Sequence, residues 1–558
     1  MKFTLQNVLL FLFLGLGLAA QAAGKNELSI ALNAEFDTIN PIVNTMMTGT
    51  MVDDAVLRPM VMLTPEGHPK PVLIKEIPSL ENKKATFIQD AQGKHLKTEF
   101  EFLPEAHWGD GTPVTCNDLK AAWRIGSDPM VATPNRDDYK NIQSITVDSK
   151  NPKKCTLIFK KPFYDFYLNL PRPLPAHLEL PVLEANKNKA QGYEHNSLYV
   201  TDVRNVGLYN GPYRVSEIKF GSHIILVPNE TFYGEKPYFK KIIFRFILNS
   251  TAMEANLLSG NVQMISSSGL SFDQALAFEK KVKAQNLPYE VQFVPGVMYS
   301  HIDVNLDDPI LSDKKVRQAL AYSFNRDDLV KAFFDNRQPP AYHFSTKFDD
   351  WFTDNPKDIT IYTFSRHKAE KLLDEAGWKM NADGYRRKDG KKLTLTLSGV
   401  TDTKLNEMLA VYLQNQWKQV GVELQIRNYP ARVFFSDILR HRQFQLALLT
   451  WVNPPNIVDY NSLHSSMIPS ATNGWAGHNR SGWKNAEVDK WISQAQQEFD
   501  TNKRVELMHK VLKQYTEDLP SLPAYYRSNN CVIPKGLKGY QMSGHNYTEF
   551  LQVEKWHY

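Results

Sequence analysis

The chain has 558 residues, several times the roughly 100 to 200 that usually form one domain, so several lobes must share it. Hydrophobic residues make up 42% of it and charged residues 22%, an ordinary balance for a globular protein that argues against a disordered chain. The net charge of +5 is spread along the sequence, without the clustered Lys and Arg stripe that nucleic-acid binding requires. We therefore expect a globular protein of several lobes that does not bind nucleic acid.

The first residues have the pattern of an export signal. Met1 and Lys2 precede an apolar run from Val8 to Ala20, which is shorter than the about 20 residues that a bilayer-spanning helix needs. Ala20-Gln21-Ala22 then supplies small residues at positions −3 and −1 of a cleavage site. We expect residues 1–22 to be a cleaved signal peptide, with an uncleaved anchor as the alternative. No cysteine follows the run, so the mature protein is not expected to be a lipoprotein.

The three cysteines, Cys116, Cys155 and Cys531, are widely spaced and belong to no Cys-x-x-Cys or Cys/His cluster. Zinc binding and thioredoxin-like chemistry therefore have no support. An exported protein can hold one disulfide, and three pairings are possible, among which the sequence does not choose. At least one thiol must stay free or pair between molecules.

Helical and strand-like patterns alternate through most of the chain, which predicts an α/β fold with mixed sheets covered by helices. Leu28 to Leu32 reads as a short strand, and Thr115 to Asp118 reads as a capping box that opens a helix. Further along, helical periodicity follows the N-cap candidates Ser365 and Asn485, with Gly377 ending the first of these helices. Alternating apolar residues predict strands over 393–397 and 422–426.

The segment from Phe444 to Trp451 is nearly all apolar and is followed by Asn453-Pro454-Pro455, which predicts a strand buried on both faces. Trp451 would then lie at its carboxyl end, and Glu35 lies just beyond the end of the first strand. Ligands of open α/β sheets bind outside the carboxyl ends of strands. Both residues are therefore candidates for a ligand cleft.

Several short motifs occur in a fixed order along the chain. They are Thr38-Ile39-Asn40-Pro41; His107 to Thr115 with Asp118; Asn210-Gly211-Pro212-Tyr213; Asn305, Asp313 to Leu320 and Asn325-Arg326; Ala369 to Trp378; and a tail through Asn485, Asp489, Arg504, Pro520 and Tyr525. In this order they resemble extracellular solute-binding protein family 5, the oligopeptide, dipeptide and nickel binders of ABC importers. We interpret the motif residues as turns and caps, and expect Arg317 to hold a salt bridge or backbone carbonyls.

The resemblance implies a periplasmic binding protein fold of type II, with two main lobes joined by a hinge and one inserted lobe. The first lobe would comprise residues 23–68, 202–303 and 523–558, the inserted second lobe 69–201, and the third lobe 304–522. The hinge crossings would lie near Asp303 to Asn305 and near Leu522 to Tyr525. Closure over a ligand would be a hinge motion at these few residues.

The resemblance also implies the function. A periplasmic monomer would capture a peptide or peptide-like ligand between its lobes and deliver it to an ABC transporter permease and its ATPase subunits. Backbone pairing with the ligand would supply affinity with little sequence specificity. The family's ligand-contacting positions correspond here to Glu35, Ser266, Ser267, Tyr299, Trp451 and Tyr525. No catalytic residue and no cofactor is implied.

One position departs from the family's pattern. Peptide binders of the family carry an Asp three residues after the Trp, where it pairs with the ligand's α-ammonium, and this chain has Pro454 there. The next carboxylate is Asp459. Loss of a charge-assisted hydrogen bond costs about 1.5 to 3 kcal/mol. Either Asp459 or Glu35 replaces the missing carboxylate, or the ligand lacks a free amino terminus.

Two alternative functions compete with peptide binding. The first is binding of a non-peptide solute, such as a metal chelate or an amino-acid conjugate, although the 15 His residues form no coordinating cluster in the sequence and no metal site is expected. The second is an exported hydrolase. It is disfavoured because the chain has no Gly-x-Ser-x-Gly elbow, no His-Glu-x-x-His motif and no recognisable Cys/His pair. There is also no Walker A motif, so ATP hydrolysis would belong to a separate subunit.

We predict that the exported protein begins at Ala23, because signal peptidase cleaves after the small residue at position −1. N-terminal sequencing of protein recovered from outside the cytoplasmic membrane tests this. Retention of Met1 would show that the apolar run stays attached as an anchor.

Overall fold

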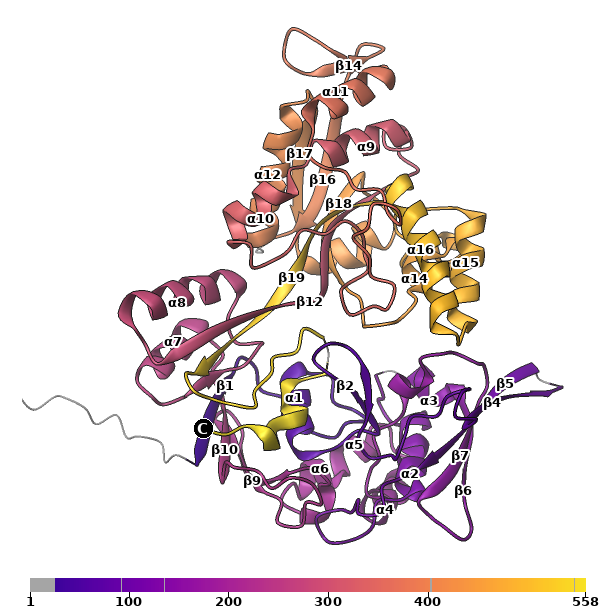
Figure 1. Ribbon diagram of the computed structural model, residues 1–558, viewed down its shortest axis with the longest axis vertical. Helices are drawn as coiled ribbons and strands as arrows, with labels where there is room; N and C mark the ends of the chain where they lie inside the picture. The colour runs from indigo at the N-terminus through magenta and orange to yellow at the C-terminus, as the bar shows by residue number, and fades with distance from the viewer. Residues whose placement is uncertain (1–25, 92, 135, 402–403, 546) are drawn as a thin grey trace, which may run out of the picture.

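The computed structural model describes residues 26–558 except 92, 135, 402, 403 and 546 (Figure 1). The expected signal peptide, residues 1–22, lies outside the described residues. Within them the main feature is a mixed sheet of ten strands. Their order is β17 (Glu423–Tyr429), β16 (Thr394–Val400), β18 (Leu446–Val452), β12 (Tyr289–Val304), β19 (Ser521–Pro534), β11 (Met264–Ile265), β1 (Glu27–Leu32), β10 (Lys241–Phe246), β9 (His223–Pro228) and β8 (Tyr213–Lys219). The predicted mixed α/β architecture is confirmed.

The two longest strands, β12 and β19, join the two halves of the molecule. They run antiparallel side by side, and Figure 1 shows them passing from one half into the other. Their register shifts between Pro295 and Tyr299, and from Met298 onward β12 also pairs with β18. We call residues 26–295 with 527–558 the lower half, and residues 299–526 the upper half. The expected hinge position at Asp303 lies inside β12, beyond this register shift, so the proposed lobe boundaries stay predictions.

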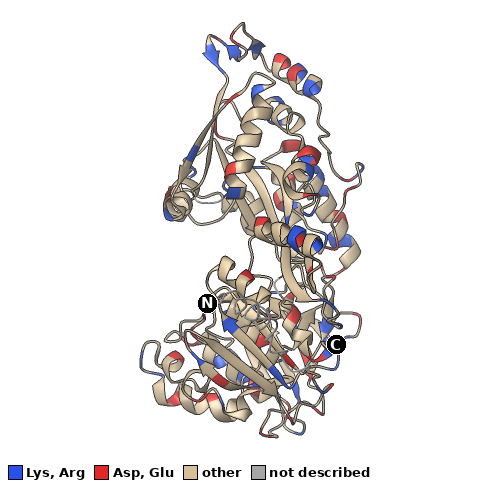
Figure 2. Cartoon of the chain, turned by 90° about the vertical axis from the view of Figure 1, so that its left-hand side faces the viewer, with Lys and Arg blue, Asp and Glu red and all other residues tan. Residues whose placement is uncertain are grey.

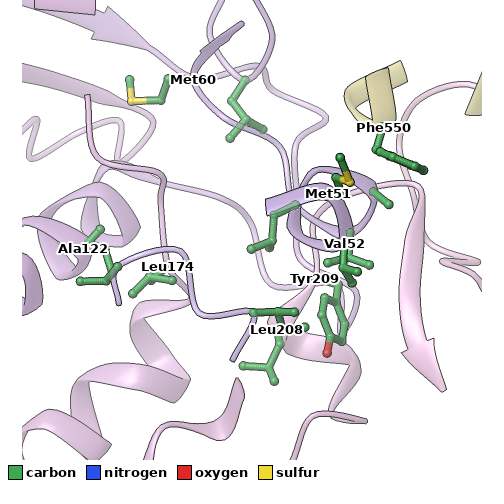
Figure 3. Packing of buried hydrophobic residues seen from close by; sticks show 14 of the residues in the cluster. Met51, Val52, Met60, Ala122, Leu174, Leu208, Tyr209 and Phe550 are labelled. Carbon is green, nitrogen blue, oxygen red and sulfur yellow. The ribbon is translucent and has the colours of Figure 1, made fainter. Parts of the chain in front are cut away.

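In the lower half, one hydrophobic core joins segments that are distant in sequence. Met51 and Val52 pack near Leu208, Tyr209 and Phe550 (Figure 3). The same core extends to a four-stranded sheet with the order β4 (Ala85–Asp90), β5 (Gly93–Glu101), β7 (Lys154–Phe159) and β6 (Ile142–Val147). This sheet lies within the expected inserted lobe 69–201, and its buried face is continuous with the rest of the half.

Helices cover the sheets of both halves. Those of the lower half are α1 (Met47–Val56), α2 (Cys116–Ser127), α3 (Arg136–Asn141), α4 (Ala176–Asn186), α5 (Gly192–Asn196), α6 (Leu198–Thr201), α7 (Ser250–Leu258) and α8 (Phe272–Gln285). Those of the upper half are α9 (Lys314–Tyr322), α10 (Arg326–Phe334), α11 (Arg366–Glu375), α12 (Lys404–Lys418), α13 (Ala431–Val433), α14 (Tyr460–Leu463), α15 (Ala486–Gln497) and α16 (Thr501–Asp518). Helices α15 and α16 pack beside one another in Figure 1.

Short additional elements complete the fold. These are the 3-10 helices η1 (Phe166–Asn169), η2 (Val206–Leu208), η4 (Ser465–Met467), η5 (Ala471–Asn473) and η6 (Glu549–Lys555), the π-helical turn η3 (Phe434–Leu439), the strand pair β2 (Val61–Leu63) and β3 (Pro69–Pro71), and the hairpin strands β13 (Lys379–Met380), β14 (Arg386–Lys388) and β15 (Lys391–Lys392).

The local predictions from capping signals are confirmed. The Thr115 backbone N–H donates to Asp118 at 2.6 Å, which forms the expected capping box of α2. Ser365 accepts from the Lys368 N–H at the start of α11, and Gly377 follows that helix with a φ of +87°. Arg317 donates to the carbonyls of Leu311, Ser312 and Asp518, as expected of a residue that ties elements together. Its role is structural.

One disulfide links helix α2 to the four-stranded sheet. Cys116, the first residue of α2, is bonded to Cys155 of β7, 39 residues further along the chain. Cys531 is a free, buried thiol to which Tyr540 donates a hydrogen bond. Of the three pairings left open by the sequence, the structure therefore has Cys116 with Cys155.

Charged residues of both signs are interspersed over the two halves (Figure 2). Among the described residues, no helix is both long enough and apolar enough to cross a membrane.

We predict that removal of the disulfide by Cys116→Ser with Cys155→Ser lowers the free energy of unfolding by about 4 kcal/mol, because the unfolded chain gains the freedom of a loop of some 40 residues. Thermal unfolding with and without reductant measures it. The wild type should lose stability in reductant, whereas the double variant should not. Equal melting temperatures for the oxidised wild type and the double variant would contradict the prediction.

Candidate functional site

A small cavity lies in the upper half, at the carboxyl end of β18. It is lined by Tyr299, His301, Asp303, Phe344, Leu449, Trp451, Asn453, Asp459, Ser462, Leu463, His478, Arg480, Ser481, Trp483, Tyr515, Pro520 and Ser521, and we call it the Trp451 cavity. The volume open to the centres of water molecules is about 50 Å³. Since one water needs about 10 to 15 Å³ by this measure, the cavity has room for a small polar group and not for a whole peptide.

Strand pairing builds the floor of this cavity. In the register of β12 and β18, Tyr299 lies directly opposite Trp451, so the two side chains share a face of the sheet. Side chains two residues apart on a strand also share a face, which brings His301 and Asp303 to the same side as Tyr299. The His301 ring stacks on the Tyr299 ring with centroids 4.3 Å apart, and its Nε2 lies 3.2 Å from Asp303 Oδ1.

Residues from a later loop form the opposite wall. The guanidinium of Arg480 lies 5.1 Å from the Trp451 ring centroid, in cation–π geometry. The exposed His478 meets the same indole edge-on, with ring centroids 5.0 Å apart. Trp451 is half-buried, with cationic and imidazole groups around it. It is therefore available to a ligand at the mouth of the cavity.

The loop 453–459 connects Trp451 to the remaining carboxylate of the cavity. Pro454 lies three residues after Trp451, where the resemblance implied an Asp. Asp459 ends the loop as the N-cap of α14, where its Oδ1 accepts from the Ser462 N–H at 3.0 Å. The Asp459 carboxylate therefore lines the same cavity as Trp451.

The charges of the cavity are unequal. Two carboxylates, Asp303 and Asp459, face one guanidinium, that of Arg480. Burial lowers the pKa of Arg480 and the two carboxylates raise it, so Arg480 stays charged at neutral pH. Partial desolvation lowers the pKa of His478 although much of its side chain is exposed, and the neighbouring Arg480 acts in the same direction. The cavity thus has one more carboxylate than guanidinium, and the His301 ring lies beside Asp303, with its Nε2 3.2 Å from Asp303 Oδ1.

The tyrosines at the back of the cavity are neutral hydrogen-bonding groups. Burial raises the pKa of Tyr299 well above its usual value, and its hydroxyl lies 3.1 Å from Ser521 Oγ. Burial likewise raises the pKa of Tyr515, which also bonds Ser521. These hydroxyls supply polar contacts without charge.

The structure brings three of the seven candidate residues together: Tyr299, Trp451 and Asp459 line the same cavity. Tyr525 lies elsewhere, because it pairs with Ser300, one position from Tyr299, and so points to the other face of the sheet. There it packs on Phe334 at 4.6 Å and is 1% exposed. In this conformation Tyr525 is a core residue of the upper half and not part of the Trp451 cavity.

The other three candidates lie at one edge of the lower half. Glu35 follows β1 and Ser266 follows β11, and these two strands are parallel neighbours. The Glu35 carboxylate accepts from the Gly221 N–H at 2.7 Å. Ser266 is fully buried and Ser267 is half-buried. None of the three lines the Trp451 cavity, so their contact with a ligand stays a prediction.

Of the charged and imidazole side chains that line the cavity, sequence reasoning found Asp459 and missed the other four: His301, Asp303, His478 and Arg480. The first two could have been found, because they follow Tyr299 at a spacing of two within one strand. His478 and Arg480 lie in an irregular loop, where no periodicity indicates which side chains meet Trp451. Among the described residues, no group of three or more His, Cys, Asp or Glu side chains has an arrangement that could hold a metal ion.

Comparison with known proteins identifies the family. Residues 94–473 match the bacterial extracellular solute-binding proteins, family 5 Middle. The chain belongs to this family. It is 26% identical over 455 residues to the oligopeptide-binding protein AppA of Bacillus subtilis, a match that covers 80% of this chain and 78% of that protein.

Solved structures agree with this assignment. The oligopeptide-binding protein of Thermus thermophilus, complexed with a pentapeptide, aligns over 95% of this chain and 96% of its own with a TM-score of 0.67 and 25% identity. NikZ of Campylobacter jejuni, in complex with Ni(L-His), aligns over 96% of this chain and 100% of its own with a TM-score of 0.68 and 24% identity. The chain therefore has the fold of a family 5 solute-binding protein, and the family binds solutes outside the cytoplasm without catalysing a reaction.

We predict that Trp451→Ala weakens ligand binding by about 1 to 3 kcal/mol, as expected for an aromatic contact at the centre of a site, while the melting temperature changes little because the side chain is half-buried. Calorimetry with the ligand recovered from the purified protein measures it. Trp417→Ala is the control: Trp417 is fully buried, so that variant should lose stability. Unchanged affinity together with a large loss of stability in Trp451→Ala would make Trp451 a core residue instead.

Proposed function

We propose that this family 5 protein captures peptide-like ligands between its halves and delivers them to an ABC importer, whose permease and ATPase subunits are separate chains. The observation that carries the proposal is the Trp451 cavity, where an aromatic platform and an excess carboxylate lie at the carboxyl end of a sheet strand. The named relatives that bind oligopeptides support the ligand class. The cavity would receive one polar group of the ligand, and the rest would lie between the halves.

The ammonium group of a free peptide is the ligand group that best fits the cavity. Asp459 is the carboxylate we assign to it, because Asp459 lines the cavity and Arg480 balances only one of the two carboxylates there. Glu35 is the weaker candidate, since its carboxylate lies outside the cavity. Asp459 would thus replace the family Asp whose place Pro454 occupies.

The setting of this function follows from the sequence. The export signal of residues 1–22 supports a location in the periplasm or outside the cell, after cleavage and without a lipid anchor. The protein is proposed to act as a monomer, because capture needs only the two halves of one chain. No catalytic residue is assigned, and a turnover assay against peptides and esters should release no product.

A non-peptide solute is the second candidate ligand. Two imidazoles, His301 and His478, lie beside carboxylates in the cavity, a set of groups that also suits an amino-acid conjugate or a metal chelate. NikZ, a structural neighbour, was solved with Ni(L-His). Since the described residues of this chain hold no arrangement of three metal ligands, a metal would have to arrive inside its chelate.

We predict that Asp459→Asn weakens binding of a free peptide by about 1.5 to 3 kcal/mol, because it removes a charged hydrogen bond. N-acetylation of the peptide should cost the wild type a similar amount, and the two changes should not add, since both remove the same contact. Native mass spectrometry of freshly purified protein identifies the ligand, and calorimetry compares its free and acetylated forms.

Two variants serve as controls for this experiment. Asp313→Asn changes an N-cap aspartate of the same kind, at α9, outside the cavity, and should leave affinity unchanged. Glu35→Gln should weaken binding less than Asp459→Asn does. The reverse order would assign the contact with the ligand ammonium to Glu35. If acetylation makes no difference to the wild type, the ligand is not held by its amino terminus, and the conjugate or chelate becomes the better candidate.

A further inference from the structure

Two buried aromatic residues of the lower half, Phe272 and Tyr164, belong to hydrophobic clusters of the upper half. Tyr164 lies between β7 and η1 in the lower half, yet its side chain is 6% exposed within a hydrophobic cluster of the upper half. All other described members of that cluster come from residues 299–526. Tyr164 therefore reaches across the boundary between the halves and is buried on the far side.

The Tyr164 hydroxyl holds the backbone of the loop 453–459. It donates to the carbonyl of Asn456 and accepts from the N–H of Val458, an N···O distance of 3.0 Å. Burial raises the pKa of Tyr164 well above its usual value, so the phenol keeps the proton that it donates. The two bonds fix the middle of the loop whose ends place Trp451 and Asp459 in the cavity.

The ring of Tyr164 is also held in place. The Arg504 guanidinium lies 4.0 Å from the ring centroid, and Arg504 is itself oriented by a bond from Nη1 to the Glu498 carbonyl at 2.9 Å. Both hydrogen bonds of the Tyr164 hydroxyl are buried. A hydrogen bond in such surroundings is stronger than one in water.

The loop is also hydrogen-bonded to residues of the upper half through Asn456. The Asn456 N–H donates to Asp349 Oδ1 at 2.8 Å, and Asn456 Oδ1 accepts from the Asp350 N–H at 2.7 Å. Asn456 has a φ of +58°, a left-handed conformation that Asn tolerates better than most residues. Its backbone N–H is thus bonded within the upper half, while its carbonyl is bonded to the lower half.

We propose that Tyr164 is a positioning residue for ligand capture, which sets the loop 453–459, and with it Asp459, only when the two halves are in contact. The ligand group in the cavity and the closing of the halves are then coupled through one phenol. The inference deepens the proposed function and rests on it for the role of Asp459. The contact itself can be tested without any ligand.

Hydrogen–deuterium exchange on the ligand-free protein tests the proposal with the variant Tyr164→Phe, which keeps the ring and removes the hydroxyl. The Val458 N–H loses its acceptor and should exchange roughly two- to tenfold faster, as expected for one lost hydrogen bond. The Ser462 N–H, which is held by Asp459 and not by Tyr164, should also exchange faster. Faster exchange at Ser462 reports that Asp459 has moved, which a purely packing role of Tyr164 would not cause.

Tyr213→Phe is the matched control. Tyr213 is equally buried and donates to the Phe239 carbonyl at 3.0 Å, but both residues lie in the lower half. Exchange at Val458 and Ser462 should be unchanged in this variant. Faster exchange at Val458 alone in Tyr164→Phe, or equal effects in both variants, would overturn the proposal. Because no ligand is used, these outcomes are independent of whether Asp459 binds an ammonium group.

Discussion

The pairing of β12 with β19 is the constraint on which the rest of the structure depends. These two strands carry the sheet from one half into the other, so their register helps to set which side chains face the Trp451 cavity. Because side chains alternate along a strand, a shift of β12 by one residue against β19 and β18 would exchange Tyr299 with Ser300 and move the stack with His301 away from Trp451. One irregularity of this register lies between Pro295 and Tyr299, in the segment between the halves, and a second lies between Ser300 and His301 in the upper half.

The chemistry of the Trp451 cavity follows from that register combined with a loop. The sheet contributes Asp303 on the same face as Tyr299, and the loop after β18 contributes Asp459. Removing two carboxylates from water is costly unless cations compensate them, and Arg480 compensates one. A ligand ammonium would compensate the other, so binding would relieve an imbalance of charge within the cavity. The proposed site would then select the charge of one ligand group and leave the shape of the rest of the ligand unrestricted.

Local features of the fold could be predicted from the sequence because they depend on neighbouring residues. The capping box at Thr115 and the helix after Ser365 follow from spacing alone. Trp451 at the end of β18 follows from an apolar run and the turn after it. Tyr525 could not be placed, because its face depends on pairing with a strand more than 200 residues away. The meeting of Arg480 with Trp451 likewise depends on the path of an irregular loop, for which no periodic pattern exists.

The contact of Tyr164 with the loop 453–459 also joins residues that are distant in sequence. Tyr164 bonds to backbone atoms of the loop and not to its side chains. A phenol bonded to a carbonyl and an N–H places few demands on the side chains of the loop, except that Asn456 must adopt a positive φ. The hold of Tyr164 on the loop therefore does not depend on which side chains stand at positions 454 and 459. The coupling we propose would then be kept when the ligand-binding group of the loop changes.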